Sequence, residues 1–561
     1  MTSVPVLTGD KLASSSQAGS PTYDESLTGF SAAGDNDNNA ESHDLGSNDD
    51  GDEDTVHRRR RAEKKGSSFD QRDMFRMGKI QQLRRNFRFV SIFGFTMVLM
   101  ATWEAQLSAN IFGLINGGTG GLIWVYIGTF TGFLAAIASM AEMASMAPTT
   151  GGQYHWVSEF APRRAQKFLS YIVGWLCVLG WQVGNTSIGF LASSQILGLA
   201  VLNNPSYTIQ RWHQTLLIIA INTFCQIFNS FLASRLPLVE GIVLVLHIFG
   251  FFAILIPLWV LGPRGEPRAV FFTFTDGGGW GNVGLSCLVG MLSPVFSFIG
   301  PDSATHMSEE LRDASRSLPR AMMATALVNG GMGFVMIVTF CMTMGGDIEA
   351  ILATPTGQPF IQVFYNATKS NAAASVMTGI MIIMAIFGNV TNVATSSRQV
   401  WAFARDKGLP FSGVLSYVRP GWDIPLNAVL LSYAIAVLLA LINIGSTAAF
   451  NIITSLGTGA LISSYIVSIS CLILKRLRRE PLLPARWSLG RYGLPINIFS
   501  VLFLTLVFIM SFFPQTRKVT PESMNWNVLV YSAVVTFSIA YFAVRGRFRY
   551  VGPVEYVRKE D

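Results

Sequence analysis

Twelve apolar segments constrain the fold of this 561-residue chain more than any other feature of its sequence. Most of them reach the roughly 20 residues that a helix needs to cross the hydrocarbon core of a bilayer. A backbone that crosses lipid must satisfy its own hydrogen bonds, and a helix does so within one segment. The segments span about 89–115, 121–147, 168–202, 213–234, 238–262, 282–307, 321–345, 373–402, 425–443, 447–474, 493–514 and 525–544.

The composition agrees with a membrane protein. Hydrophobic residues make up 50% of the chain and charged residues only 13%, whereas a soluble globular domain carries about 25% charged residues. We therefore predict an all-α polytopic membrane protein with twelve transmembrane helices. The five cysteines lie in apolar segments without a CxxC pair, which indicates buried thiols rather than disulfides or metal ligands.

The sequence does not indicate an enzyme. It contains no Walker loop and no HExxH or GxSxG motif, so we expect no catalysis, no metal ion and no cofactor. The net charge of +7 is consistent with basic loops beside anionic lipid, and it requires no nucleic-acid partner.

Basic residues are concentrated in alternate loops, and the side of the membrane that is rich in Lys and Arg is cytoplasmic. The basic set comprises Arg163, Arg164, Lys167, Arg235, Arg312, Arg316, Arg320, Arg405, Lys407, Arg419, Lys475, Arg476, Arg478, Arg479, Arg486 and Arg491, whereas the opposite set has only Arg211, Arg264, Arg268, Lys369, Arg517 and Lys518. Both termini are therefore expected in the cytoplasm. Asn366, in a glycosylation sequon, is expected outside.

We expect four regions along the chain. Residues 1–86 form a disordered cytoplasmic N-terminal tail, because its first part is rich in Ser, Gly, Asn and Asp. Residues 87–475 form a ten-helix core, 476–545 two peripheral helices, and 546–561 a cytoplasmic C-terminal tail. The basic residues just before span 1 either bind anionic lipid headgroups or only determine the topology.

Residues 290–306 begin as a membrane span and then change character. Ser297, Gly300, Pro301 and Asp302 fall where a spanning helix should be apolar. Proline removes a backbone donor, and the freed backbone groups must line a cavity or be buried in protein. A charged residue at the bilayer centre costs about 3 kcal/mol, so a function is expected for this interruption.

Span 1 has a matching irregularity, because residues 102–110 place an acid, amides and hydroxyls at membrane depth. Spans 1 and 6 lie five apart and run in opposite directions, which predicts a five-plus-five inverted repeat with broken helices 1 and 6. The alternative is that each polar group satisfies a local interhelical hydrogen bond. The predicted substrate-binding residues are Thr102, Trp103, Glu104, Ala105, Gln106, Ser297, Phe298, Ile299, Gly300 and Asp302.

Several motifs resemble those of the amino acid–polyamine–organocation superfamily. They are residues 297–304 with 318–321, Glu142 with 148–156, residues 396–398 and 404–410 with 425–428, and residues 211–213 and 304–307. The combination is similar to the fungal branch of GABA, choline and amino acid permeases and covers about residues 75–550. It implies an amino acid or amine transporter that works by alternating access. Spans 1, 2, 6 and 7 would rock against spans 3, 4, 8 and 9, and spans 11 and 12 would be peripheral.

One departure from the family pattern concerns span 1. Amino acid carriers of the superfamily usually have a Gly-Ser-Gly-like break there, which holds the substrate carboxylate, whereas residues 102–108 contain no glycine. The rings of Trp103 and Phe298 could instead face an ammonium group, and Glu104 could supply the counter-charge.

Two further residues are candidates for coupling or gating. His247 lies in span 5, and its ordinary pKa suits protonation from an acidic exterior, so we expect protons to drive transport. Thr395, Ser396 and Ser397 of span 8 are hydroxyls that could ligate sodium instead. Glu142, near the cytoplasmic end of span 2, is expected to contact the loop at residues 148–156.

A non-transporting nutrient sensor on the same fold is the alternative function. The sequence does not select among GABA, choline, polyamines and neutral amino acids. For the membrane, we expect the plasma membrane rather than the vacuole, although the residues themselves do not discriminate between the two.

Overall fold

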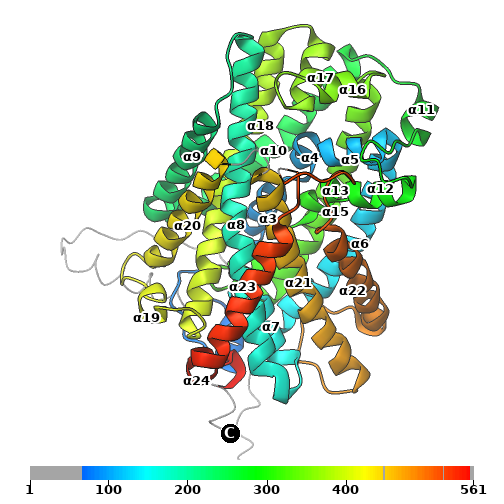
Figure 1. Ribbon diagram of the computed structural model, residues 1–561. Helices are drawn as coiled ribbons and strands as arrows, with labels where there is room; N and C mark the ends of the chain where they lie inside the picture. Colours follow the sequence, from blue (N-terminus) through cyan, green and yellow to red (C-terminus); the bar gives the residue numbers. More distant parts are fainter. Residues whose placement is uncertain (1–65, 446–448, 522, 556–561) are drawn as a thin grey trace, which may run out of the picture. The chain divides into compact units, whose positions relative to one another are not determined.

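The computed structural model describes residues 66–445, 449–521 and 523–555 (Figure 1). Among them, twelve helical segments are long and apolar enough to cross a membrane, and no β-strand forms, which confirms the predicted fold class. Spans 1 to 12 are α3–α5 (Phe89–Ile115), α6 (Gly118–Met146), α8 (Arg163–Asn203), α9 (Arg211–Phe231), η1–α10 (Ala233–Leu261), α12–α14 (Val283–His306), α15 (Ala314–Thr343), α18 (Asn371–Arg405), α20 (Leu426–Gly445), the part Leu456–Leu477 of α21 (Ala449–Leu477), η3–α22 (Gly490–Met510) and α23–α24 (Asn527–Arg549).

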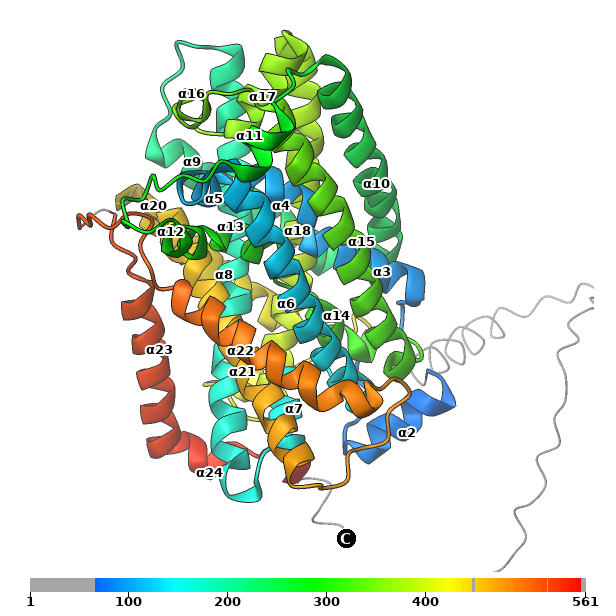
Figure 2. The ribbon, with the colours of Figure 1, turned by 90° about the vertical axis from the view of Figure 1, so that its right-hand side faces the viewer.

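Short helices occupy the connections between spans. They are α2 (Ser68–Arg76), α7 (Gln153–Phe160), α11 (Pro267–Phe272), η2 (Ser308–Glu310), α16 (Ile348–Leu352), α17 (Pro359–Thr368), α19 (Ser412–Leu415) and η5 (Pro553–Glu555). Helices α7, α19 and α24 lie at one end of the bundle and α11, α16 and α17 at the other (Figures 1 and 2). We call the first end, with loops 147–162, 307–313, 406–425 and 478–489, the basic end.

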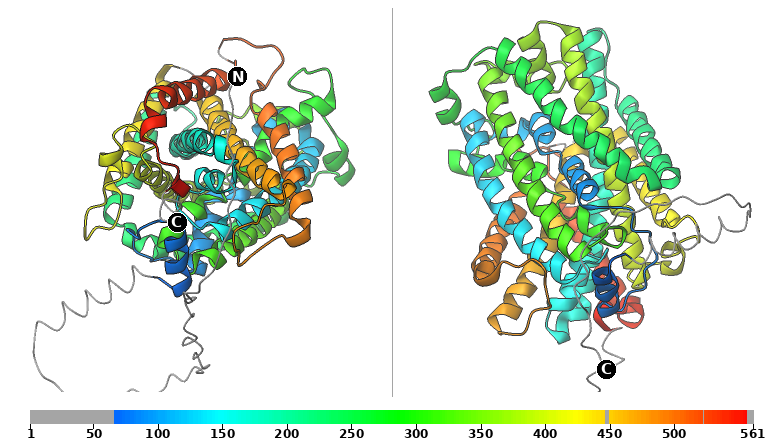
Figure 3. Two further views of the ribbon diagram at one scale, coloured as in Figure 1. Left: turned by 90° about the horizontal axis from the view of Figure 1, so that it is seen from below. Right: turned by 180° about the vertical axis from the view of Figure 1, so that it is seen from behind.

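The packing follows the predicted repeat of five spans. Extensive helix contacts join span 2 to span 7, span 3 to span 8 and span 4 to span 9. Span 12 lies at the edge when the bundle is viewed along its axis (red in Figure 3). Only 11% of its apolar window is buried in protein, against 61% for span 3, so span 12 contributes little to the core.

Span 1 is broken at Ala101. Helix α3 (Phe89–Met100) ends there, and α4 (Thr102–Ser108) and α5 (Ile111–Ile115) continue the crossing. Ala101 has φ +41°, in the left-handed region, which costs an L-residue about 1 kcal/mol or more. The break therefore precedes the polar stretch at 102–108 and forms without glycine.

Span 6 is broken between α13 (Leu292–Phe298) and α14 (Ser303–His306). Gly300 has φ +106°, a conformation that glycine adopts without a steric cost. Pro301 follows and has no N–H to give to the carbonyl of Ser297, four residues earlier. The sequence of the break thus leaves a buried carbonyl without its helical partner.

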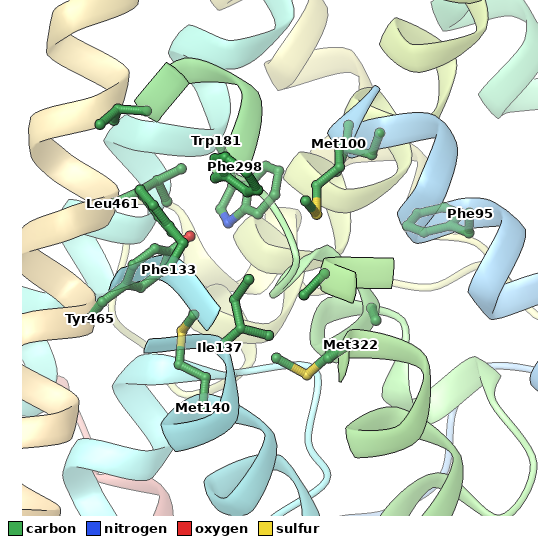
Figure 4. Packing of buried hydrophobic residues seen from close by; sticks show 14 of the residues in the cluster. Phe95, Met100, Phe133, Ile137, Met140, Trp181, Phe298, Met322, Leu461 and Tyr465 are labelled. Atoms are coloured by element: carbon green, nitrogen blue, oxygen red, sulfur yellow. The ribbon is translucent and has the colours of Figure 1, made fainter. Parts of the chain in front are cut away.

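Large side chains pack around this break. Phe298 is fully buried and stacks on Phe133 of α6, with ring centroids 5.7 Å apart. Figure 4 shows both rings in one cluster with Trp181, and Leu461 and Tyr465 of α21 belong to the same cluster. Close packing on both sides of the interruption fixes the position of the two half-helices.

Residues 66–86 differ from the predicted disordered tail, because they are folded against the basic end. Met74, Met77 and Leu83 are buried there. Asp70 of α2 accepts hydrogen bonds from the backbone N–H of Asp313 (2.9 Å) and Ala314 (3.0 Å), and so caps α15. The remainder of that prediction, residues 1–65, lies outside the described residues.

The predicted C-terminal tail also differs, because residues 546–554 are packed. Tyr550 is fully buried and its ring lies 5.2 Å from that of Tyr171 in span 3. Its hydroxyl hydrogen-bonds Ser170, and the backbone N–H of Val551 donates to the carbonyl of Asp406 at 3.4 Å. Aromatic burial and backbone hydrogen bonds therefore hold this segment at the basic end.

Replacement of Asp70 tests the folded N-terminal segment. Its carboxylate faces the buried guanidinium of Arg85 at 3.4 Å, so Asp70→Ala leaves that charge without its counter-ion. We expect a loss of about 3 kcal/mol, seen as a lower unfolding temperature of the detergent-purified protein by tryptophan fluorescence. The control Asp73→Ala removes an acid of the same helix that pairs with part-exposed Arg76, and should cost about 1 kcal/mol or less. Equal unfolding temperatures for both variants would contradict the folded segment.

Candidate substrate cavity

A cavity of about 110 Å³ lies between the two helix breaks. Spans 1, 3, 6, 8 and 10 line it, and Ala101, Ile299 and Gly300 bring the broken backbones to its wall. Most of its span 3 and span 8 residues come from the halves of those helices that are farther from the basic end. A volume of this size holds several water-sized groups, so it can take a small solute.

Hydrogen bonds between spans 1 and 6 satisfy the broken backbone. The hydroxyl of Thr102 donates to the carbonyl of Ser297 at 2.9 Å, and the amide of Gln106 donates to the Ser297 hydroxyl at 2.7 Å. The Thr102 hydroxyl takes the place of the N–H that Pro301 lacks. These predicted binding residues thus join the half-helices, and none of the three is part of the cavity wall.

Glu104 is the one ionisable side chain among the described residues that line the cavity. Its Oε1 lies 2.7 Å from Nδ1 of His247 in span 5. The other ring nitrogen of His247 lies 2.9 Å from Oδ1 of Asn329 in span 7, whose amide donates to the carbonyl of Met97 at 3.0 Å. A hydrogen-bonded chain therefore runs from the cavity through span 5 and back to the last turn of α3.

The chain requires a proton between Glu104 and His247. Asn329 uses its amide nitrogen on Met97, so its Oδ1 accepts and the Nε2 of His247 carries a hydrogen. Without a proton between them, the lone pair on Nδ1 of His247 and the carboxylate oxygen of Glu104 would face each other at 2.7 Å and repel. The pair is therefore either imidazolium with carboxylate or neutral imidazole with carboxylic acid. The second carboxyl oxygen of Glu104 has no hydrogen-bond partner among the described residues.

The aromatic rings of the cavity differ from those expected. Trp103 is buried against His247 and Phe251, with centroid distances of 5.8 and 5.9 Å, and is absent from the cavity wall. Phe298 belongs to the aromatic core. Trp181 and Phe296 line the cavity instead. A break interrupts the helical periodicity, so residue order alone does not identify the ring that faces the cavity.

Asp302 is the last residue before α14, on the other side of the span 6 break from α13, and it does not line the cavity. It accepts hydrogen bonds from the Gln153 amide at 2.6 Å and the Tyr465 hydroxyl at 2.5 Å. Its carboxylate thus connects span 6 to α7 and span 10. This contact places Asp302 in the closure of the basic end rather than in contact with a solute in the cavity.

Buried ion pairs close the basic end. Glu309 makes two hydrogen bonds to Arg405, at 2.7 and 2.8 Å, and Glu310 accepts one from Nε of Arg398 at 2.8 Å. Burial alone would raise the pKa of the Glu309 carboxyl. The charge and hydrogen bonds of Arg405, together with the charges of Lys79 and Arg85, outweigh burial and lower that pKa below its ordinary value. The loop between spans 6 and 7 is therefore fastened to span 8.

Glu142 makes its hydrogen bonds to a different connection from the one expected. Its carboxylate pairs with Arg476 and accepts hydrogen bonds from the Ser488 hydroxyl (2.8 Å) and the Leu489 N–H (3.0 Å). It thus holds the connection between spans 10 and 11 rather than the loop at 148–156. The charge of Arg476, remote in sequence, attracts this acid.

Of the other predicted residues, only Ala105 lines the cavity, and Asn366 and the span 8 hydroxyls do not. Asn366 is half-buried in α17 at the end opposite the basic end, and accepts a hydrogen bond from Gln362 at 2.9 Å. The hydroxyls of Thr395, Ser396 and Ser397 each donate to a carbonyl of their own helix, and none lines the cavity. Ala105 follows Glu104 in the sequence, and both residues line the cavity.

Sequence reasoning missed two residues that define the site. Asn329 is a polar residue within span 7, and a search for amides at membrane depth would have found it. Trp181 lies between Gly180 and Gly184 of span 3, and all three line the cavity. The small neighbours leave room beside the indole ring.

Comparison with known proteins identifies the family. Residues 87–534 match the family model described as amino acid permease. A Macrophomina phaseolina protein whose name assigns it to amino acid/polyamine transporters is 33% identical over 438 residues, 77% of this chain and 96% of that protein. The choline transporter of Saccharomyces cerevisiae is 28% identical over 83% of this chain and 82% of its own. Amino-acid permease 2 of Neurospora crassa is 28% identical over 85% of this chain and 88% of its own.

The family match includes both broken helices and every residue of the cavity wall. The twelve apolar spans and the interrupted spans 1 and 6 agree with it. The chain therefore belongs to the amino acid permease family of the amino acid–polyamine–organocation superfamily and is an integral membrane permease.

Proposed function

We propose that this permease is a proton-coupled secondary transporter for a small organic amine or amino acid, and that the substrate ammonium group binds Glu104. The observation that carries the proposal is the carboxyl oxygen of Glu104 without a partner in the wall of an otherwise uncharged cavity. An ammonium group there would regain the hydrogen bonds and counter-charge that it loses on leaving water.

The cavity wall favours a cationic end over an anionic one. No Lys, Arg or His is among the described residues that line it, so a substrate carboxylate would meet no side-chain cation. The rings of Trp181 and Phe296 offer π-faces, which attract a desolvated ammonium by about 2 kcal/mol. These features suit amine substrates whose N–H groups can donate to Glu104. Among the relatives, the choline transporter is named for another organic ammonium ion.

The Glu104–His247 pair supplies a route to coupling. An ammonium group beside Glu104 favours the carboxylate form, so the shared proton moves to His247. Loss of that proton would remove the 2.7 Å bond between spans 1 and 5. Substrate and proton thus act on one pair, and each changes the affinity for the other.

In alternating access, the ion pairs at the basic end would form the gate that closes the cavity on that side. Opening requires that Glu309 and Glu310 leave Arg405 and Arg398, while spans 1 and 6 move together through Thr102 and Ser297. We propose that the basic end faces the cytoplasm of a cell whose plasma membrane holds the protein, as the loop charges suggest. The cavity then takes its substrate from outside.

Glu104→Gln tests the ammonium site. The amide keeps the size of the side chain but removes its charge, so uptake of the preferred amine should fall by at least tenfold, the equivalent of about 1.4 kcal/mol. Radiolabelled uptake in a transport-deficient host, with competing amines and amino acids, measures both rate and preference. The control Glu349→Gln, on α16 away from the cavity, should transport normally. Wild-type affinity and rate in Glu104→Gln would place the substrate elsewhere.

His247→Ala tests proton coupling. Wild-type uptake should rise as external pH falls from about 7 to 5, because a higher external proton concentration drives a coupled transporter harder, and should collapse with a protonophore. The variant should lose most of this pH dependence. The control His213→Ala changes a histidine at the end of the bundle opposite the basic end, and it should retain the pH dependence. Full pH dependence in His247→Ala would exclude the residue from coupling. Sodium-dependent wild-type uptake would overturn proton coupling, and binding without accumulation would favour a sensor.

Gly300→Leu tests the break in span 6. A leucine at φ +106° is strained by about 1–3 kcal/mol, and its Cβ would lie 3.5 Å from Leu99 at the cavity wall. We expect loss of uptake with the protein still present in the membrane, measured by surface labelling. Gly379→Leu is the control, because nothing lies within 4 Å of its added Cβ. Normal kinetics for Gly300→Leu would show that the break does not form the site.

A further inference from the structure

A second cavity, of about 610 Å³, lies at the basic end between the C-terminal segment and the loop after span 8. Three cationic side chains line it: Lys407 from the loop, and Arg545 and Arg549 from the end of span 12. No Asp or Glu is among its described lining residues. The wall therefore carries three positive charges and no negative charge to balance them.

These three cations differ from other basic residues of the same end. Arg405, Arg476 and Arg486 each pair with an acid of the protein. Within the described residues, Lys407, Arg545 and Arg549 have no ion pair and no side-chain hydrogen bond, and all three are exposed. Basic residues that only determine membrane topology do not have to surround a common cavity, whereas Lys407, Arg545 and Arg549 line the same one.

The rim of the cavity is apolar. Phe411 and Phe548, which both line it, are 83% and 73% exposed, and neighbouring Val544 is 78% exposed. Val544 and Phe548 lie at the end of span 12 and Phe411 in the loop that follows span 8, so all three are placed at the boundary of the membrane. A soluble ligand would leave this rim in water, whereas a lipid would cover it.

The backbone adapts locally to form the cavity. Residues Phe542–Gly546 form a π-helical turn that carries Arg545, and such turns are frequent at functional sites. Lys407 and Phe411 both have positive φ, +61° and +55°. Each costs roughly 1 kcal/mol or more in a residue other than glycine.

We propose that this cavity binds the phosphorylated headgroup of an anionic membrane lipid. Arg545 and Arg549 would donate to phosphate oxygens, Lys407 would supply a third charge, and the acyl chains would lie against Phe411 and Phe548. The site is independent of the substrate cavity. A bound lipid would also fasten the C-terminal segment, whose Tyr550 packs on span 3, to the end of span 8.

The test compares two triple variants that remove the same charge. Lys407→Gln, Arg545→Gln and Arg549→Gln together alter the cavity, while Arg478→Gln, Arg479→Gln and Arg547→Gln together alter exposed cations outside it. Short-chain phosphatidylinositol bisphosphate is titrated onto each detergent-purified protein by native mass spectrometry. Phosphatidylcholine of equal chain length and soluble inositol trisphosphate are the other probes.

We expect tight binding of the phosphoinositide by the wild type and by the control triple. The cavity triple should bind on the order of 100-fold more weakly, and Arg549→Gln alone about fivefold more weakly, as expected for about 1 kcal/mol per cation. Equal loss in both triples would overturn the cavity assignment. Equal binding of phosphatidylcholine would remove the role of the phosphates, and equal binding of inositol trisphosphate would remove the role of the membrane.

Discussion

The absence of hydrogen-bonding partners in the hydrocarbon core of a bilayer determines how this permease is built. A break in a spanning helix exposes carbonyls and N–H groups, and each unsatisfied group costs several kcal/mol in lipid. The structure places partners from other spans at both breaks. Thr102 of span 1 donates to the Ser297 carbonyl that Pro301 leaves open. At the end of α3, the Met97 carbonyl keeps its helical bond from the Ala101 N–H and accepts a second one from Asn329 of span 7. The two interruptions are thus supported jointly, and a cavity remains between them.

The same hydrogen bonds connect the cavity to a titratable pair. Asn329 fixes the histidine tautomer of His247, and His247 in turn requires a proton in its contact with Glu104. Glu104 lines the cavity, and one of its carboxyl oxygens contacts His247 while the other has no hydrogen-bond partner among the described residues. One residue can therefore meet a substrate ammonium group and sense the protonation state of its partner, which is the link that a coupled transporter needs.

Much of this could be predicted from the sequence, because hydropathy and helix breakers act locally. The twelve spans follow from apolar runs, the break in span 6 from Gly300-Pro301, and the break in span 1 from the polar residues at 102–110. Glu104 and His247 were each expected to matter, but they are 143 residues apart and no local pattern joins them. The positions of Trp103 and Phe298 were not predictable, because the turn at each break changes which helix face points inward. The fold of residues 66–86 depends on Asp70 and Arg85 meeting the distant start of α15, and the partner of Glu142 is equally remote.

The central claim is that the substrate nitrogen occupies the cavity between the two breaks and contacts Glu104. A cryo-EM structure of the protein with its transported amine bound at acidic pH measures this directly. The account predicts density between Ala101 and Gly300, with the amine nitrogen about 3 Å from the free carboxyl oxygen of Glu104 and Trp181 beside it. Density beside Asp302 or Trp103 instead, with Glu104 still without a partner, would contradict it.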